Sequence, residues 1–369
     1  FGLLTVVAVA GWLPGWKIVS RQHRVTAGLL AVWLGMVVVS WVRWNQITYA
    51  PLGRLWFQAS AASGALVGYG LAQWTKRARW LPAVLAAAMW IVALTGVVGV
   101  VRPAFALPDR HPAHASPAPD VLISQAHFDD QIRVRGYSLS TRSLELGETL
   151  AVDLFLEAMQ PIPEDYAMAL QLVSPVEGDQ STLLNFNTLP GSGNYPTLFW
   201  QPGEVIVDRY RLRMPEDVQR TQAWRLMLVF YRLSDGYRLP VVIDGQPAGE
   251  MLGLGLIRVG GETASEAPPR TPDGAQPVFG DAIRLEGLRF EREGDLLQIE
   301  AWWRAIAPLQ MDLTAFVHLY DADGGLLDTG DAPPLGGAYP TSMWQVGDVL
   351  ADTYVLSWQE GAQRVGLGW

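Results

Sequence analysis

The chain has 369 residues, half of them apolar, and a formal net charge of −9. The absence of cysteine excludes disulfide bonds, thiolate nucleophiles and cysteine-ligated metals. Residues 1–101 contain eight Lys or Arg and no acidic residue, so all 36 acidic residues come later, a distribution that does not fit a nucleic-acid-binding protein.

The basic part of the chain reads as a membrane domain. Its apolar segments are Phe1–Trp16, Val25–Val42, Leu55–Trp74 and Trp80–Val101. The last has 22 residues, about 33 Å of helix against a bilayer core of about 30 Å. Basic clusters at residues 17–24 and 76–79 indicate cytoplasmic loops. We therefore expect four transmembrane helices at 1–101, the first truncated, in a multi-pass cell-membrane protein with its later domains on the extracytoplasmic side. A buried soluble bundle is the alternative, although its helices would show a charged face.

The loop between the second and third apolar segments carries Arg43, Gln46 and Arg54. Because a guanidinium can donate paired hydrogen bonds to a phosphate, these residues are candidates for a lipid-phosphate contact. The alternative is that the arginines only reach toward lipid headgroups.

After a Pro/Ala-rich linker at 102–119, short alternating runs bounded by Gly, Pro and Asp predict an all-β structure. An internal repeat supports two immunoglobulin-like β-sandwich domains at 120–259 and 278–369, joined by a linker at 260–277. The second reaches only the first strand of its final hairpin, so we expect it to be incomplete and the natural protein to extend at both ends.

The repeat includes YPTLFWQPGEVIVDRY at 195–210 and YPTSMWQVGDVLADTY at 339–354. Residues that recur in both copies are expected to be structural, with a carboxylate capping loop N–H groups and an indole filling the sandwich end. They are Tyr195, Trp200, Asp208, Tyr210, Tyr339, Trp344, Asp352 and Tyr354.

These motifs resemble a known family. Pro51-Leu52-Gly53-Arg54 with a following aromatic, and the tandem Tyr-Pro-Thr…Trp…Asp-x-Tyr domains, resemble the C-terminal part of bacterial phospholipid-carrier-dependent, mannosyltransferase-like glycosyltransferases of the GT-C fold. The family form has Gln-Gly-Arg contiguous, whereas here Gln58 follows Phe57. The resemblance implies a polyprenyl-phosphate sugar donor and a catalytic carboxylate on an outer membrane loop. Since residues 1–101 contain no carboxylate, that residue would precede Phe1.

Other candidate sites are weaker. Trp302 and Trp303 point to opposite faces of one predicted strand, so one indole is a candidate for stacking on a sugar, with sheet packing as the alternative. The four aspartates of YDADGGLLDTGD at 320–331 are better explained by a hairpin turn than by a calcium loop. His318 lies in a predicted strand without a second ligand nearby. No metal, cofactor or catalytic residue is expected.

Two functions follow. The first is the C-terminal part of a membrane glycosyltransferase, inactive on its own, whose β-sandwiches contact a glycan or a protein acceptor. The second is a non-enzymatic, membrane-anchored envelope protein that presents two β-sandwich binding domains. Both require a lipid bilayer as partner and neither involves nucleic acid.

Overall fold

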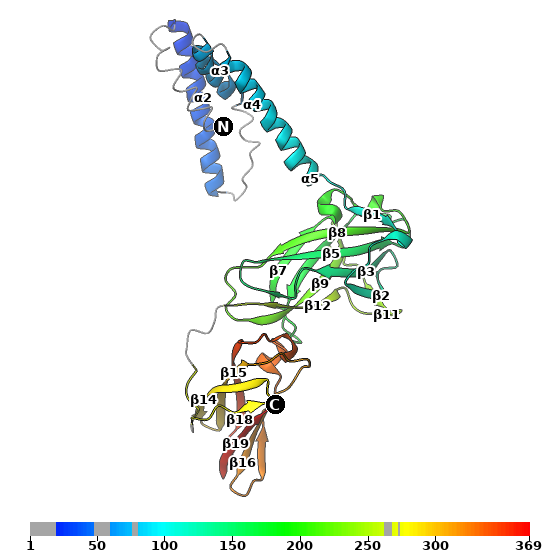
Figure 1. The fold of residues 1–369 in the computed structure, drawn as a ribbon, viewed down its shortest axis with the longest axis vertical. Coiled ribbons are helices and arrows are strands. Elements are labelled where there is room, and N and C mark those ends of the chain that lie inside the picture. Colours follow the sequence, from blue (N-terminus) through cyan, green and yellow to red (C-terminus); the bar gives the residue numbers. More distant parts are fainter. Residues whose placement is uncertain (1–19, 48–59, 76–79, 262–267, 272–273) are drawn as a thin grey trace. The chain divides into compact units, whose positions relative to one another are not determined.

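The computed structural model describes residues 20–47, 60–75, 80–261, 268–271 and 274–369. The chain divides into two compact units, Phe1–Phe105 and Ala106–Trp369. The first is helical within its described residues and the second is built from strands (Figure 1).

The described helices of the first unit are α2 (Arg21–Ile47), α3 (Ser60–Thr75), α4 (Leu81–Gly96), the π-helical η2 (Val97–Val101) and α5 (Arg102–Ala104). The last three follow one another without a break and form one continuous rod (Figure 1). Within this rod, residues Ala86–Ala104 are long and apolar enough to cross a membrane, as judged by length and composition alone.

The prediction of four transmembrane helices is wrong for the described residues, and so is the multi-pass membrane localisation drawn from it. The apolar part of α2 covers only Arg24–Ser40, and α3 has 16 residues. At 1.5 Å per residue each is about 24–26 Å long, shorter than a bilayer core. The first predicted segment and the start of the third lie outside the described residues.

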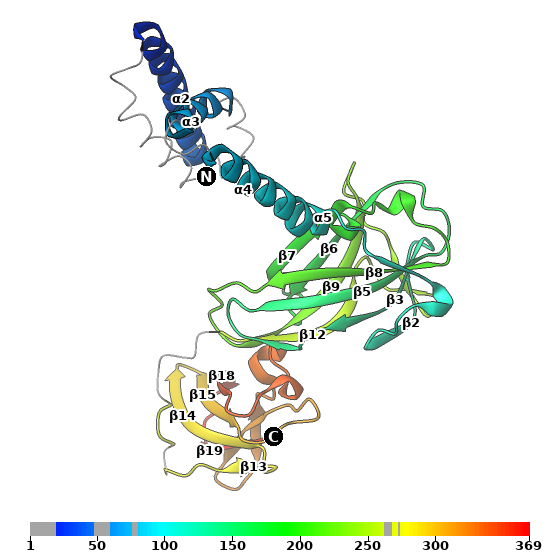
Figure 2. The same ribbon diagram turned by 45° about the horizontal axis from the view of Figure 1, so that its top comes forward.

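The second unit contains sandwich-like pairs of sheets. In the first β-domain, one sheet has the order β1-β8-β5-β3-β2-β10-β11 and the other β4-β12-β9-β6-β7 (Figure 2). The strands are β1 (Asp109–Pro112), β2 (Val121–Phe128), β3 (Ile132–Leu139), β4 (Ser143–Leu144), β5 (Thr149–Ala158), β6 (Tyr166–Val173), β7 (Thr182–Thr188), β8 (Glu204–Arg213), β9 (Gln222–Arg232), β10 (Val241–Ile243), β11 (Gln246–Pro247) and β12 (Leu252–Val259). β1 pairs with β8 inside the segment predicted as a linker.

The second β-domain repeats this plan with sheets β13-β14-β15-β18 and β17-β16-β19. Its strands are β13 (Val278–Phe279), β14 (Ile283–Glu293), β15 (Leu296–Ala305), β16 (Phe316–Asp321), β17 (Leu326–Thr329), β18 (Val349–Ser357) and β19 (Ala362–Gly368). By order and pairing, β14, β15 and β18 correspond to β3, β5 and β8. The sequence repeat is therefore a repeat of strand topology.

Each β-domain has its own hydrophobic core between its two sheets. In β5, Leu150, Val152, Leu154 and Leu156 alternate with residues of the opposite face and are fully buried. This alternation follows from the two-residue period of a strand, which sends successive side chains to opposite faces.

A chain segment also covers the outer face of one sheet in each β-domain. Gly136 of β3 pairs with Phe155, and Gly287 of β14 pairs with Trp302. A Cβ at Gly287 would lie 2.1 Å from the carbonyl oxygen of Pro269, and one at Gly136 would lie 2.5 Å from the Cγ of Pro119. These glycines let a preceding segment pass directly over the sheet and close off the neighbouring aromatic ring.

We predict that Gly287→Ala destabilises the second β-domain. The new methyl group forces Pro269 away from the sheet, an overpacking change that costs about 1–3 kcal/mol. Gly253→Ala is the matched control, since its Cβ would meet only the Met227 sulfur at 3.8 Å. Thermal unfolding of the full chain measures both, and equal melting temperatures for the two variants would contradict the prediction.

Candidate functional site at the junction of the two β-domains

The described residues contain only part of the predicted lipid-phosphate site. Arg43 and Gln46 lie near the end of α2, which continues to Ile47, so they belong to a helix and not to the predicted loop. Arg54 lies outside the described residues. The phosphate contact stays a prediction.

The predicted sugar-stacking residues are both buried, which is incompatible with an open stacking platform. Trp302 is 3% exposed, and the Arg289 guanidinium lies over it, with Cζ 5.3 Å from the centroid of the Trp302 ring. Trp303 is fully buried in the second core, and its indole nitrogen donates to the Tyr354 hydroxyl at 3.2 Å. The sequence could not show that residues 268–269 cover the outer face of this sheet.

The two repeated aspartates anchor a tight loop in each β-domain. The Asp208 carboxylate accepts hydrogen bonds from the Gly191 backbone N–H, at 2.8 Å, and from the Tyr210 hydroxyl. Asp352 likewise accepts from the Leu335 N–H at 3.0 Å and from the Tyr354 hydroxyl. Burial raises the pKa of both carboxyls, and the hydrogen bonds that they accept oppose this shift.

The repeated Tyr and Trp close the same loop end. The Trp200 indole donates to the Tyr195 carbonyl at 3.1 Å, and the Trp344 indole donates to the Tyr339 carbonyl at 2.9 Å. Both indoles are almost fully buried. Each pair therefore ties a loop that precedes β8 or β18 to its own sandwich.

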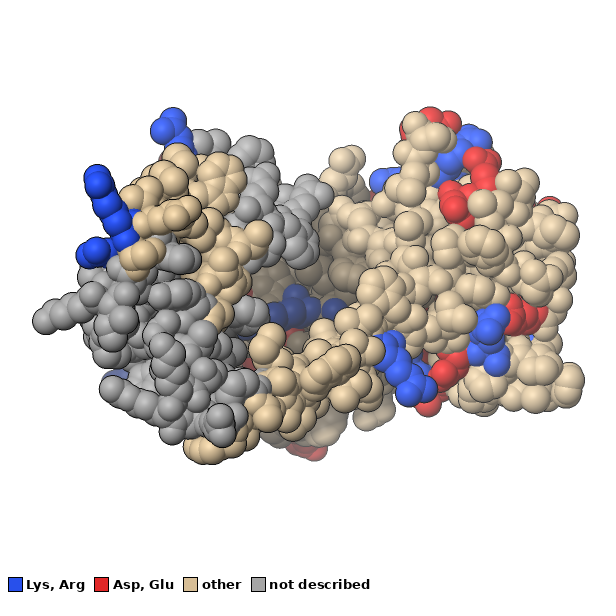
Figure 3. All heavy atoms as spheres, turned by 90° about the horizontal axis from the view of Figure 1, so that it is seen from above, with Lys and Arg blue, Asp and Glu red and all other residues tan. Residues whose placement is uncertain are grey.

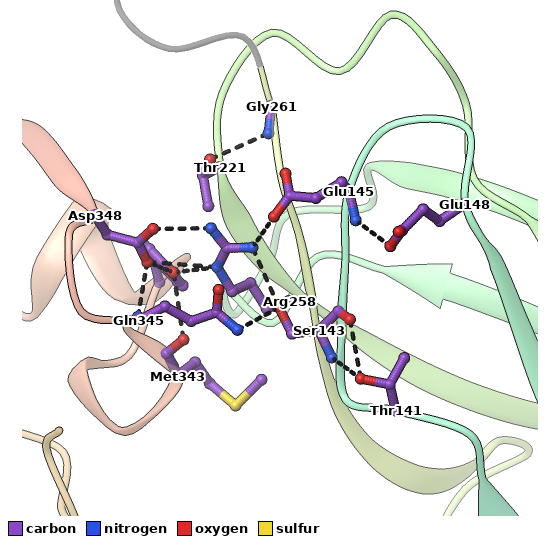
Figure 4. A network of polar contacts seen from close by, with 11 residues as sticks. Thr141, Ser143, Glu145, Glu148, Thr221, Arg258, Gly261, Met343, Gln345 and Asp348 are labelled. Atoms are coloured by element: carbon purple, nitrogen blue, oxygen red, sulfur yellow. Dashed lines mark hydrogen bonds and ion pairs between the residues drawn. The ribbon is translucent and has the colours of Figure 1, made fainter.

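Beside this loop, Tyr339 and Asp348 form a socket for an arginine of the first β-domain. Figure 4 shows this arginine, Arg258, with its guanidinium turned toward Asp348. The Arg258 guanidinium donates to the Tyr339 hydroxyl oxygen and to Asp348 Oδ1, both at 2.8 Å. The Tyr339 hydroxyl in turn donates to Asp348. Burial raises the pKa of Tyr339, and the Asp348 carboxylate raises it further, so the hydroxyl keeps its proton.

Arg258 also forms hydrogen bonds with residues of its own β-domain. Its guanidinium donates to Glu145 at 2.9 Å and to the Ser143 hydroxyl at 3.2 Å, while Gln345 of the second β-domain donates to the same hydroxyl at 2.8 Å. The backbone adds a further link, from the Ala223 N–H to the Ala338 carbonyl at 2.9 Å. With only 5% of Arg258 exposed, these groups compensate a largely desolvated charge.

The first β-domain has an equivalent socket of Tyr195 and Glu204. The Tyr195 hydroxyl donates to Glu204 at 2.9 Å, and Arg110 of β1 lies 3.6 Å from the same carboxylate. The Arg110 guanidinium also lies over the Tyr195 ring, 5.1 Å from its centroid. In both β-domains an arginine from an earlier strand enters a socket made by a tyrosine and a carboxylate.

The remaining polar residues of the β-rich unit serve turns and local pairs. Asp321 accepts from the Asp323 and Gly325 N–H groups, as a turn requires, and His318 lies 3.1 Å from Asp331. Among the described residues no group of three or more His, Asp or Glu is arranged to hold a metal. On the face shown in Figure 3, basic and acidic side chains of this unit lie beside one another and do not form a patch of one sign.

A groove with a volume of about 400 Å³ lies along β8. Its lining includes Asp153, Arg209 and Tyr210. Arg209 is paired with Asp153 at 3.3 Å and with Asp109 at 2.8 Å, so its charge is already matched. The equivalent of Arg209 in the second β-domain is Thr353, so the groove is not a feature of the repeat.

Sequence reasoning missed the arginine socket. An acidic residue ends the shared Trp-Gln-x-Gly stretch in both copies, at Glu204 and Asp348, and that recurrence was a usable signal. Arg110 and Arg258 lie outside the repeated motif, and only the fold brings them to it.

Comparisons with known proteins identify no family. No protein-family model matches the chain, and no curated protein matches it. One solved structure with some likeness is Spo0M, a sporulation control protein from Bacillus subtilis, at 14% identity and a TM-score of 0.23, over 61% of this chain and 90% of that one. At that TM-score the likeness supports no argument. Nothing in these findings identifies a glycosyltransferase.

We predict that Asp208→Ala lowers the stability of the first β-domain by about 1–3 kcal/mol, because the Gly191 N–H and the Tyr210 hydroxyl lose a buried acceptor. Thermal unfolding of the full chain and hydrogen exchange at the Gly191 amide measure the loss. Exchange at the Leu335 amide of the second β-domain should not change. A variant with unchanged exchange at Gly191 would contradict the loop-anchoring role.

Asp208→Asn is the control because it keeps an acceptor and does not titrate. Since burial raises the pKa of Asp208 above its ordinary value of 3.8, the unfolded chain releases this proton at lower pH than the folded one. The contribution of this carboxyl is therefore complete below 3.8 and is lost as the pH rises through the folded pKa. As the pH rises from 3.8 through the folded pKa, the free energy of unfolding of the wild-type protein should fall relative to that of Asp208→Asn.

Proposed function

We propose that this chain is a non-enzymatic protein anchored to a lipid bilayer by one helix, and that its two β-sandwiches act as one rigid arm that presents their surfaces. The observation that carries the proposal is the buried Arg258, which belongs to the first β-domain and is compensated by Tyr339 and Asp348 of the second. The apolar stretch Ala86–Ala104, which ends two residues before the β-rich unit begins, supports the anchor.

Rigidity follows from the energetics of the junction. A guanidinium removed from water is tolerated only where carboxylates and hydrogen-bond acceptors surround it. Arg258 has such an environment only while the two β-domains keep this mutual orientation. A hinge motion at the linker would leave Arg258, Tyr339 and Asp348 without their partners in each other's domains.

The sugar-stacking role of Trp302 and Trp303 is not part of this proposal, since both indoles are buried. The presented surfaces are the exposed strands and loops of the two sandwiches. The arm sets the distance and orientation of those surfaces relative to one another.

The test measures the distance between the two β-domains. Because the chain has no cysteine, Gln180→Cys and Glu293→Cys give one spin label on each domain of the full chain in phosphatidylcholine vesicles. Double electron–electron resonance should show a narrow distribution of distances between the two labels, and this distribution should broaden when Arg258→Ala is added. Breaking the buried pair should also destabilise the second β-domain by about 3 kcal/mol.

Arg225→Ala is the matched control. Arg225 lies on β9, directly opposite β12 in the sheet, and its guanidinium donates to the Pro175 carbonyl of its own domain. This variant should leave the distribution narrow. A broad distribution in the unmutated arm, or one that Arg258→Ala leaves unchanged, rules out a rigid arm held at this junction.

A further inference from the structure

The loop before β8 exposes two large apolar side chains at its tip. Leu198 is 47% exposed and Phe199 62% exposed, in the short helix η5 (Thr197–Phe199). The neighbouring Trp200 is buried, so this is not a loosely packed region. Two exposed apolar residues on an ordered loop leave a surface that water solvates poorly.

The repeat shows that the fold does not need an apolar side chain at the position of Leu198, whereas Met343 keeps an apolar residue at the position of Phe199. The corresponding helix is η7 (Thr341–Met343), and both loops are built alike. Asp165 accepts from the Leu198 N–H at 3.1 Å, and Asp312 accepts from the Ser342 N–H at 3.1 Å. Leu198 therefore corresponds to Ser342, and an apolar residue stands where the same backbone also accepts a serine.

This loop lies against the start of the β-rich unit. The Asn194 side-chain amide donates to the Ala106 carbonyl at 3.4 Å. A Cβ at Gly191 would lie 3.1 Å from Pro108, and Arg110 contacts Tyr195. Residues 106–110 therefore pack against residues 191–195 of this loop, the part that directly precedes Leu198 and Phe199. Leu107, within residues 106–110, is 50% exposed.

The covalent chain brings these residues close to the end of the candidate span. Ala106 follows Ala104, the last residue of the span, with one residue between them. Two residues reach at most about 7 Å. When Ala86–Ala104 crosses a bilayer, Ala106 therefore lies at the membrane–water interface, and the loop that packs on residues 106–110 has to lie near it.

We propose that Leu107, Leu198 and Phe199 form a lipid-contacting rim that rests on the bilayer surface. The inference depends on the proposed anchoring helix. Leucine and phenylalanine side chains favour insertion just below the headgroups. The rim fixes the first β-domain at the membrane surface, a second attachment besides the helix.

The charges around the rim indicate which lipid it contacts. Asp165 lies next to Leu198, and Glu204 is paired with Arg110 at 3.6 Å. No excess of basic side chains accompanies the apolar residues on this loop, so attraction to anionic headgroups is not the driving force. We expect contact with neutral, zwitterionic lipid, driven by apolar burial and insensitive to salt.

The experiment places one spin label at a time in the full, otherwise cysteine-free chain, in vesicles of phosphatidylcholine. Leu198→Cys is the test site and Ser342→Cys its matched control at the same place in the second β-domain. Val92→Cys, inside the candidate span, reports whether the helix is in lipid. Collision with oxygen, which concentrates in the membrane, is compared with collision with a water-soluble nickel chelate.

The label at Leu198→Cys should collide more with oxygen and less with nickel than the label at Ser342→Cys, and raised salt should not change either. If Val92→Cys reports lipid while Leu198→Cys behaves like Ser342→Cys, the rim is refuted and the anchor stands. If Val92→Cys itself reports water, the anchoring proposal fails and the rim fails with it.

Discussion

The arrangement of the two β-domains depends on one buried cation. Arg258 is the penultimate residue of β12 in the first sandwich, is 5% exposed, and pairs with the Asp348 carboxylate of the second. Taking a guanidinium out of water costs several kcal/mol, and this is recovered only where partners meet it in good geometry. Here the geometry is complete, because Tyr339 accepts from the arginine and donates to the same carboxylate. The pairing therefore specifies orientation more than it adds stability.

Within each sandwich a buried carboxyl group has a comparable role. Asp208 and Asp352 each accept a backbone N–H from a loop that contains three consecutive residues of positive φ. In the first copy the residue that donates is Gly191, but in the second it is Leu335, which adopts a φ of 50°. A branched residue rarely adopts this conformation, and it persists where surrounding contacts over-determine it. The hydrogen bond from Leu335 to Asp352 is such a contact.

The sequence was informative where a local period determines structure. Short alternating runs predicted an all-β structure after residue 119, and β5 is such a run, with alternate apolar residues buried in the core. The internal repeat predicted two β-domains of one plan, although the role of Gly136 and Gly287, which let a preceding segment cross the sheet, became visible only in the structure. The sequence failed where long-range packing decides. One of Trp302 and Trp303 was a candidate for an exposed indole, but both are buried, and the segment that covers this sheet, Pro268 and Pro269, is distant in sequence. Arg258 lies outside every repeated motif.

The membrane prediction failed for a different reason. Apolar composition was counted over segments, but a span needs an uninterrupted apolar helix of sufficient length. α2 is long, yet its apolar part is limited to 17 residues, since basic residues occur near both of its ends. Only the rod ending at Ala104 combines length with apolarity among the described helices. Composition alone therefore overestimated the number of helices that are long and apolar enough to span a bilayer.

The internal repeat separates two kinds of constraint. Positions that keep their chemistry in both copies, such as Glu204 and Asp348 or Asp208 and Asp352, hold the loop and the arginine that enters beside it. Positions that differ, such as Leu198 and Ser342, share a backbone and its hydrogen bonds, so the fold does not dictate their side chains. What distinguishes them is their surroundings: the first loop packs against the residues that follow the candidate span, and the second lies at the junction with another sandwich. The differences between the copies therefore identify side chains that depend on the surroundings of each sandwich and not on the fold. A single sandwich could not have shown this.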